Sequence, residues 1–437
     1  MRLILLVFFY VLGFSTYGQF GFQWKSEKNK IVIPFTFVDN LIIIPIEVNN
    51  TKLNMLLDSG SEPSLIFSFP ENDSIHLFNT RKIKISGLGN EEIAEGLLSN
   101  NNVANIQGFT NEDFQILVIL DEDLNFSSRI GIPVNGILGY SFFQNNLVEI
   151  NYTKKKITIY KDRKILESGK LKSYTKLPVK IVKDRPYLDV KTKLENKSHN
   201  LKLLIDTGMA DGLWLFENDS IKSGKNYFED VLGQGVGGTV LGKRSRLEEI
   251  QISKFKFSLP LVAYPDPTSY KQLEMVEGRD GSIGGGILKR FNVFIDYEGS
   301  QLLLKKNSLY DEEFNYNMSG IELQHNGVEW VKEQYVDTDN KSSKNEKNII
   351  FDSENFKYRF TLKPVFEIAT IRKNSPAELA GLLAGDRLLK INGRNVGNLS
   401  KQKLDEMLLD EDGKKMELEI ERKGKVKKFE FHLKKIL

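Results

Sequence analysis

The sequence predicts an all-β fold of two related lobes about a pseudo-two-fold axis, followed by a smaller α/β unit. Short apolar runs, separated by Gly, Asn and Asp turns, dominate residues 30–306 and indicate strands. A long-period repeat divides that region into two similar halves. A polar stretch then leads to a tail in which strands alternate with helices. The length of 437 residues is also too great for one ordinary core.

The composition argues against several kinds of function. The 61 Lys and Arg nearly balance the 58 Asp and Glu, so the bulk charge indicates no nucleic-acid partner. The absence of Cys rules out disulfides, a thiol nucleophile and a thiolate metal site. The four His lie in no metal-binding or serine-peptidase motif. We therefore expect no metal and no cofactor.

The first residues predict a secretory signal peptide over residues 1–18. Arg2 precedes "LILLVFFYVLGFSTYG", an apolar stretch that ends in small residues at Gly18. The stretch is too short to span a bilayer comfortably, and a retained membrane anchor is the alternative. No later run is long and apolar enough to cross a membrane. We therefore expect an exported protein, periplasmic or secreted, with no transmembrane segment after signal removal.

The repeat is clearest around two aspartates. Asp58 lies in "NMLLDSGSEPSLI" and Asp206 in "KLLIDTGMADGLWL", and an apolar strand precedes each of them. A Gly preceded by Ile or Leu follows each Asp at a similar distance, namely Gly139 and Gly284. A single Asp-Ser/Thr-Gly is commonly just a turn, because the Asp side chain bonds nearby backbone N–H groups. Two copies at matching places in a repeat indicate a shared purpose.

The two halves are predicted to be small all-β units over residues 30–165 and 172–306. A strand pair precedes each Asp, with turns at Asn49-Asn50 and near Asn196. Related units commonly pack about a two-fold axis, which would bring the two aspartates face to face.

Two facing carboxylates suggest acid–base chemistry. At about 3 Å, Asp58 and Asp206 would share one proton and hold a water between them. The ionised member would act as general base on the water, and the protonated member would donate to a substrate carbonyl. The hydroxyls of Ser59 and Thr207 would either bond across the axis or cap their own turns.

These pieces resemble the retropepsin-like and pepsin-like aspartic peptidases over roughly residues 30–306. The resemblance implies two β-barrel lobes and an endopeptidase acting on a peptide or protein substrate, with Asp58 and Asp206 catalytic. It implies that Ile137-Leu138-Gly139 and Ser282-Ile283-Gly284 cross behind the catalytic loops. The supporting residues that it implies are Ser59, Gly60, Thr207, Gly208, Gly139 and Gly284. Met209 and Ser282 depart from the family pattern, where a small and an apolar residue are usual.

Members of that family close a glycine-containing hairpin, the flap, over the substrate. Its mobility would exclude water and gate access to the site. The alternative is a flexible surface turn. The candidates are Gly233, Gly235, Gly237 and Gly238 in the second half, and Gly87 and Gly89 in the first.

The tail, residues 315–437, resembles a bacterial-type PDZ domain with a polar insertion near 337–348. The matching segment is "SPAELAGLLAGDRLLKINGRNV", in which Ser375 before Pro376 is a good helix start. Such domains bind a protein C-terminus or an internal strand at a sheet edge. The candidates for a carboxylate-binding loop are Ser319, Gly320, Ile321 and Glu322. Glu322 replaces the usual second Gly, so a packing or regulatory role is the alternative.

Two functions from different classes remain open. One is an exported aspartic endopeptidase with a PDZ-like module. The other is a non-catalytic exported binding or scaffold protein with an inactive peptidase core. Retention of both Asp and both Gly favours the enzyme, because a binding module does not need paired carboxylates. Whether the two carboxylates meet in one cleft separates the two hypotheses.

Overall fold

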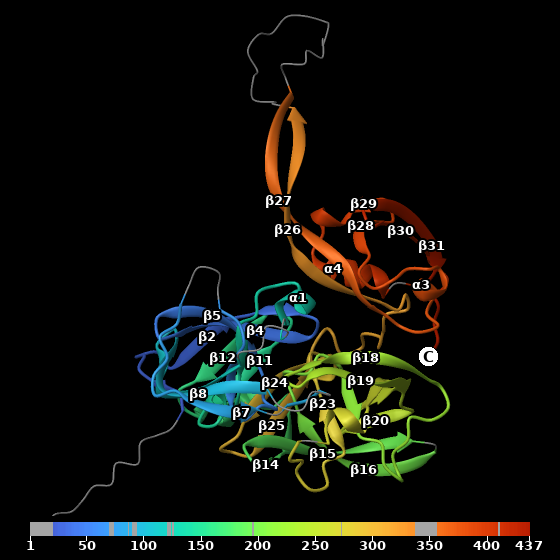
Figure 1. The fold of residues 1–437 in the computed structure, drawn as a ribbon. Coiled ribbons are helices and arrows are strands. Elements are labelled where there is room, and N and C mark those ends of the chain that lie inside the picture. The colour runs from blue at the N-terminus through green and yellow to red at the C-terminus, as the bar shows by residue number, and fades with distance from the viewer. Residues whose placement is uncertain are drawn as a thin grey trace, which may run out of the picture.

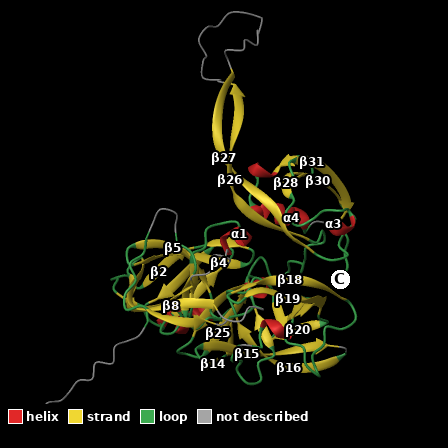
Figure 2. Cartoon of the chain, viewed as in Figure 1, coloured by secondary structure: helices red, strands yellow, loops and turns green. Residues whose placement is uncertain are grey.

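The computed structural model describes residues 21–69, 74–85, 87–89, 94–119, 124, 126–194, 196–271, 273–336, 356–409 and 411–437. The predicted signal peptide and the polar insertion near 337–348 lie outside these residues. Two β-lobes lie side by side, and a third, C-terminal unit packs across both (Figure 1). Strands dominate the cartoon in Figure 2, which confirms the predicted all-β class. No helix among the described residues is long and apolar enough to cross a membrane.

The first lobe is built on a sheet with strand order β1-β9-β6-β10-β5-β4-β8-β7, and β3 pairs with β4. Its strands are β1 (Gln23–Trp24), β3 (Thr36–Val38), β4 (Leu41–Val48), β5 (Thr51–Leu57), β6 (Ser64–Ile66), β7 (Arg81–Ile85), β8 (Ala94–Ile106), β9 (Phe109–Ile119) and β10 (Gly136–Leu138). A short helix, α1 (Phe126–Ile130), and the 3₁₀ turn η1 (Tyr140–Phe142) flank β10.

The second lobe repeats this arrangement in the order β18-β19-β22-β17-β23-β16-β15-β20-β21, with β14 paired to β15. Its strands are β14 (Lys180–Val182), β15 (Arg185–Leu194), β16 (Lys197–Ile205), β17 (Leu213–Leu215), β18 (Tyr227–Gly235), β19 (Gly238–Arg246), β20 (Glu249–Ile252), β21 (Phe255–Ser258), β22 (Leu261–Pro265) and β23 (Gly281–Ile283). Its short helical pieces are η4 (Pro267–Ser269) and α2 (Gly285–Leu288).

The repeat seen in the sequence is a repeat of topology. In the first lobe β10 runs parallel to β5 and antiparallel to β6. In the second lobe β23 runs parallel to β16 and antiparallel to β17. The predicted hairpin turn lies at Asn49 and Asn50, whose φ values of 47° and 67° suit the left-handed residues of a tight hairpin.

A third sheet joins the lobes, in the order β13-β25-β24-β11-β12-β2. Its strands are β2 (Lys30–Pro34), β11 (Leu147–Asn151), β12 (Lys156–Tyr160), β13 (Thr175–Pro178), β24 (Phe291–Asp296) and β25 (Gln301–Lys306), with η2 (Lys164–Glu167) and η3 (Gly169–Leu171) in the connection. The equivalent strands β11 and β24 pair antiparallel. That pairing places a two-fold relation at the sheet centre, and one apolar core continues through both lobes.

The C-terminal unit has a sheet of order β26-β27-β28-β30-β31, with β29 paired to β28. Its elements are β26 (Ile321–Val336), β27 (Phe356–Ile371), α3 (Pro376–Leu379), β28 (Arg387–Ile391), β29 (Arg394–Asn395), η6 (Val396–Asn398), α4 (Lys401–Leu408), β30 (Lys415–Arg422) and β31 (Lys425–His432). The Ser375 side chain accepts from the Glu378 N–H and caps α3, as the sequence predicted. The far end of the β26–β27 hairpin projects from the body (Figure 1).

Candidate active site

The two aspartates follow equivalent strands of the two lobes. Asp58 comes directly after β5, and its N–H donates to the Leu138 carbonyl at 3.0 Å. Asp206 comes directly after β16, and its N–H donates to the Ile283 carbonyl at 2.9 Å. Each aspartate is therefore fixed by the strand that runs parallel to its own. These strands, β10 and β23, are the elements that the sequence comparison of the halves singled out.

The hydroxyls of Ser59 and Thr207 bond across the axis. The Ser59 N–H donates to Thr207 Oγ1 at 3.0 Å, and the Thr207 N–H donates to Ser59 Oγ at 3.1 Å. Ser59 Oγ in turn donates to the Ile205 carbonyl at 2.7 Å, and Thr207 Oγ1 to the Leu57 carbonyl at 2.8 Å. Both residues are almost completely buried. The alternative, in which each hydroxyl caps its own turn, is not what the structure has.

Gly60 and Gly208 bring each loop against the opposite carboxylate. A Cβ placed on Gly208 would lie 2.4 Å from Asp58 Cγ, and one on Gly60 would lie 2.9 Å from Asp206 Cγ. Neither position has room for a side chain while both carboxylates stay in place. Their backbone N–H groups are used as well: Gly60 donates to Asp58 Oδ1 at 2.7 Å, and Gly208 donates to Asp206 Oδ1 at 3.0 Å.

Gly139 and Gly284 occupy the crossing points behind the two loops. A Cβ on Gly139 would lie 2.6 Å from the Ser61 carbonyl oxygen. A Cβ on Gly284 would lie 2.5 Å from the Met209 carbonyl oxygen. Both contacts are with backbone, which cannot give way as a side chain can. The structure thus brings the two aspartates and all six predicted supporting residues into one assembly on the axis.

The two carboxylates interact with each other and titrate as a pair. Burial raises the pKa of Asp58 well above its ordinary value of 3.8, and the charge of Asp206 raises it further. Burial also raises the pKa of Asp206, but the Arg279 guanidinium and the hydrogen bond from Asp58 pull it back. The pKa of both carboxyl groups is therefore raised, and the two titrate as one coupled pair.

Arg279 was not found from the sequence. It lies just before β23, and burial lowers the pKa of its guanidinium. Its Nη2 donates to Ser282 Oγ at 2.7 Å and its Nε donates to the Gly281 carbonyl at 3.2 Å. A buried serine hydroxyl needs a hydrogen-bond partner, and Arg279 supplies one to Ser282. A serine can therefore stand at this position, where the sequence comparison expected an apolar residue. No motif marks Arg279, so only the pairing of Ser282 with a cation would have pointed to it.

Tyr297 also supports the site and was missed. Its hydroxyl donates to the Ser59 carbonyl at 3.0 Å, and its ring stacks on Phe143 at 5.5 Å between centroids. Tyr297 is 4% exposed and follows β24, so the shared sheet holds the Asp58 loop directly. The signal in the sequence was the Tyr that follows Asn151 and Asp296 in the two halves.

Met209 forms part of an apolar wall beside the second aspartate. It packs in a buried cluster with Trp214, Leu232, Val240 and Ala263. Leu232 and Val240 lie on β18 and β19, so the wall connects the Asp206 loop to the hairpin above it. The unusual Met is therefore a packing residue of this lobe.

The predicted flap segments of the two lobes meet each other. The second is a true hairpin, since Gly235 and Gly238 pair at the tip of β18 and β19. The Gly237 N–H donates to the Leu88 carbonyl at 2.8 Å, and the Gly89 N–H donates to the Ser269 carbonyl at 2.9 Å. A Cβ on Gly235 would lie 2.0 Å from the Leu88 carbonyl oxygen. Gly87 faces Val236 in the same contact, while Gly233 has open space around it.

The four candidates for a carboxylate-binding loop lie at the start of β26. The Ser319 and Gly320 N–H groups donate to Asn317 Oδ1 at 3.0 and 3.1 Å, and the Ile321 N–H donates to Ser319 Oγ at 3.0 Å. Glu322 pairs with Arg129 of the first lobe at 3.1 Å. Whether this loop holds a chain end remains a prediction, but its N–H groups already have partners within the loop.

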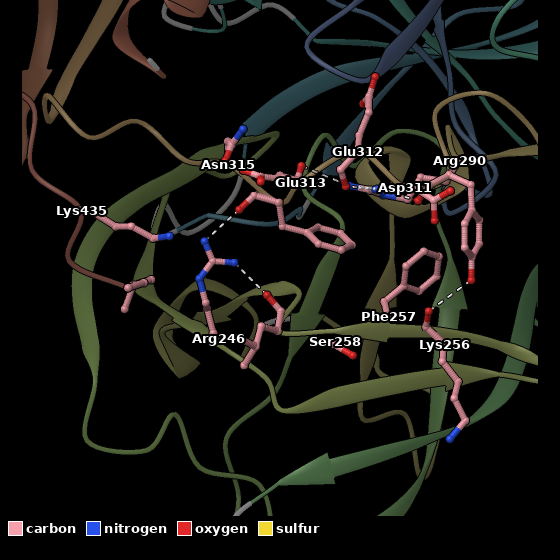
Figure 3. Close-up of a pocket in the computed structure, with 14 residues that line it drawn as sticks. Arg246, Lys256, Phe257, Ser258, Arg290, Asp311, Glu312, Glu313, Asn315 and Lys435 are labelled. Carbon is pink, nitrogen blue, oxygen red and sulfur yellow. Dashed lines mark hydrogen bonds between the residues drawn. The ribbon is translucent and has the colours of Figure 1, made fainter. Parts of the chain in front are cut away.

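A separate hollow of about 560 Å³ lies where the chain end meets the second lobe (Figure 3). Arg246 donates to the Leu259 and Phe314 carbonyls at 2.8 and 2.9 Å, and Arg290 donates to the Tyr310 carbonyl at 2.9 Å. Because both arginines are engaged with backbone, we assign this hollow a structural role. Among the described residues, no group of His, Asp and Glu is arranged to hold a metal ion.

Comparison with known proteins adds one domain assignment. A family model described as PDZ domain matches residues 367–422. Among solved structures, the chain is similar to an aspartic proteinase from Irpex lacteus, with 14% identity, a TM-score of 0.40, and coverage of 65% of this chain and 100% of that one. A TM-score this low supports no conclusion about this chain. The search of curated proteins found no match. The match lies within the C-terminal unit, residues 315–437, which we call the PDZ unit below for the domain that it contains.

Proposed function

We propose that this protein is an exported aspartic endopeptidase with a PDZ unit that binds peptide segments. The observation that carries the proposal is the pairing of Asp58 and Asp206. Each carboxylate lies against the glycine of the opposite loop, and the pair is locked by reciprocal bonds between Ser59 and Thr207. A binding protein has no use for two buried carboxyl groups that interact across an axis and titrate as a pair.

In the proposed reaction, Asp206 is the base and Asp58 is the acid. A water between the carboxyl groups attacks the carbonyl carbon of the peptide bond and gives its proton to Asp206. Asp58 donates its proton to the carbonyl oxygen, so a neutral tetrahedral diol forms without a covalent enzyme intermediate. As the diol collapses, its hydroxyl proton returns to Asp58 while Asp206 protonates the leaving nitrogen, and the C–N bond breaks. The pair then again holds one proton.

The two flap segments supply the enclosure that this chemistry needs. The Gly237 N–H donates to the Leu88 carbonyl, so the tips of the two flap segments are joined to each other. A substrate must part these tips before it reaches the carboxylates, and reclosure would exclude bulk water. Export is supported by the sequence of residues 1–18, which has the charge, length and small residues of a signal peptide.

Cleavage of a mixed peptide library tests the proposal. The mature protein, beginning at residue 19, is incubated with the library from pH 3 to pH 8, with and without the aspartic-peptidase inhibitor pepstatin. We expect inhibitor-sensitive cleavage by the wild type and a loss of at least about 10³-fold in Asp58→Asn and in Asp206→Asn. Asp189→Asn, a change to an exposed carboxylate of β15, serves as the matched control.

The outcomes separate the two classes of function. Undiminished cleavage by Asp58→Asn or by Asp206→Asn would show that the two aspartates do not catalyse the reaction. If the folded wild type cleaves nothing at any pH, a non-catalytic exported binding or scaffold protein becomes the better account.

A further inference from the structure

The PDZ unit has a sheet edge, formed by β26, that pairs with no further strand. β26 is the terminal strand of its sheet, and α4 packs against it. In PDZ domains a ligand strand lies between a sheet edge and a helix. We call this surface the β26–α4 groove and define it by Glu322 on β26 and by Lys401 and Asp405 on α4.

The first lobe already covers this groove. Helix α1 lies directly against β26 (Figure 1). From its last turn, Arg129 Nη1 meets Glu322 Oε1 at 3.1 Å, while Thr370 Oγ1 donates to the other Glu322 oxygen at 2.9 Å. Glu322 is thereby held between the sheet that carries it and the lobe that faces it.

The residue that follows α1 packs on the helix side of the groove. A Cβ placed on Gly131 would lie 2.6 Å from the Cβ of Lys401, so the backbone here touches the lysine stem. Gly131 has φ +80°, which a residue with a side chain rarely adopts. Close approach and backbone conformation both require glycine at this contact.

Lys401 is the buried centre of the contact. Its side chain is 8% exposed, and its Nζ lies 2.6 Å from Asp405 Oδ2 and 4.0 Å from Asp39 Oδ2. Asp39 belongs to the first lobe, in the turn between β3 and β4. Burial raises the pKa of Asp39, and it raises the pKa of Asp405 to about 6. The first lobe thus places the basic side chain of Arg129 against Glu322 and the acidic side chain of Asp39 near Lys401.

The loop before β26 points to an internal segment as the natural ligand. The N–H groups that would receive a terminal carboxylate are those of Ser319, Gly320 and Ile321. All three donate to side chains of the same loop, Asn317 and Ser319. A ligand with a free carboxylate would have to displace these bonds, whereas an internal strand needs only the edge of β26.

We propose that residues 126–131 of the first lobe are the resident ligand of the β26–α4 groove. The partner that competes for the groove is an extended internal peptide segment carrying a basic side chain for Glu322, as Arg129 does in the resident segment. A cavity of about 1250 Å³ adjoins the same seam, with His325 and Gly327 on one side and Ile132 and Pro133 on the other. It gives a longer peptide room to continue along β26. This inference deepens the peptide-binding part of the proposed function and does not depend on cleavage.

Hydrogen exchange of the full-length mature chain tests whether the first lobe covers the groove. The double variant Asp39→Asn/Arg129→Glu neutralises the charge facing Lys401, reverses the charge facing Glu322, and leaves the sequence of the PDZ unit unchanged. We expect faster amide exchange in residues 321–326 than in the wild type. Lys403→Glu is the matched control, because Lys403 lies on α4 and pairs with Glu406. Equal exchange in wild type and double variant would show that the first lobe does not protect the groove, and would overturn the proposal.

Binding of a defined probe tests the competition. The probe is a synthetic peptide of residues 124–134, "LNFSSRIGIPV", acetylated and amidated. Weakening the contact of the resident ligand should strengthen binding of the probe to the double variant by about tenfold or more over the wild type. The same peptide with a free C-terminus should gain nothing further. Binding that does not strengthen in the double variant, or that needs the free carboxylate, would overturn the proposal. Glu322→Arg should abolish this gain in probe binding. It should leave amide hydrogen exchange outside residues 321–326 unchanged.

Discussion

The two lobes present the same Asp-Ser/Thr-Gly loop in different electrostatic surroundings. Asp58 accepts two backbone N–H groups, from Gly60 at 2.7 Å and from Ser61 at 3.1 Å. Asp206 accepts one, from Gly208, and the cation of Arg279 acts on it. After burial, the charge of Asp206 is what raises the pKa of Asp58, whereas Arg279 lowers the pKa of Asp206. A duplicated loop thus acquires two different electrostatic environments through neighbours outside the motif.

The largest predicted difference between the two lobes concerns their loop glycines, Gly60 and Gly208. Gly208→Ala places a Cβ 2.4 Å from Asp58 Cγ, whereas Gly60→Ala places one 2.9 Å from Asp206 Cγ. We expect Gly208→Ala to lower kcat by about 10²-fold, because a misplaced reacting group costs on that order. Gly60→Ala should cost less. Steady-state kinetics of both variants on one peptide checks the ranking, and equal activity in Gly208→Ala and wild type would mean that the carboxylates can separate freely.

The hydroxyls that join the lobes should matter for stability. Thr207→Ala leaves the buried Ser59 N–H and Leu57 carbonyl without a partner, and Ser59→Ala does the same to Thr207 and Ile205. Each change should lower the free energy of unfolding by about 1–3 kcal/mol. Thr207→Ser keeps the hydroxyl and is the control in urea unfolding. A loss in Thr207→Ser as large as that in Thr207→Ala would assign the effect to the methyl group.

Removing the positive charge of Arg279 should bring the pKa values of Asp58 and Asp206 closer together. Arg279→Gln keeps a donor for Ser282 but loses the charge that lowers the pKa of Asp206. The pKa of Asp206 should therefore rise, and the acidic limb of the kcat/KM profile should move to higher pH. Activity should fall several-fold on the acid side and little on the alkaline side. An unchanged acidic limb would show that Arg279 does not act on the base.

The smallest expected effect is a pH-dependent gain in stability. Because the pKa of Asp58 is raised in the folded protein, the folded state binds this proton more tightly than the unfolded chain does. The wild type therefore loses stability as pH rises from 3.8 through the folded pKa. Asp58→Asn avoids that loss, so its Tm should exceed that of the wild type increasingly as pH rises through this window. A Tm difference that is constant with pH would contradict the raised pKa.

Site residues that belong to a short, repeated sequence motif were predictable from the sequence. Asp58, Asp206 and their glycines stand out because the same short motif occurs twice at matching places. Gly139 and Gly284 were found in the same way, since their role requires only an apolar strand that ends in glycine. The fold class followed from strand and turn signals, which depend on neighbouring residues.

Residues that act through tertiary contact could not be predicted. Arg279 belongs to no motif, and Tyr297 belongs to a repeated Asn/Asp-Tyr pair that does not reveal its partner; the partners of both are set by how the lobes pack. The meeting of Leu88 with Gly237 joins two segments far apart in the chain. The docking of α1 on β26 likewise depends on the placement of the PDZ unit, which no local signal encodes.

Titration of the paired carboxyl groups of Asp58 and Asp206 tests the central claim most directly. Selective ¹³C labelling of aspartate allows the side-chain carboxyls of Asp58 and Asp206 to be followed by NMR, with Asp58→Asn and Asp206→Asn providing the assignments. We predict two separated steps, with one carboxyl still protonated well above the ordinary value of 3.8. In Asp58→Asn, Asp206 should titrate in a single step. If both groups of the wild type ionise together near 3.8, they do not share a proton and the proposed chemistry fails.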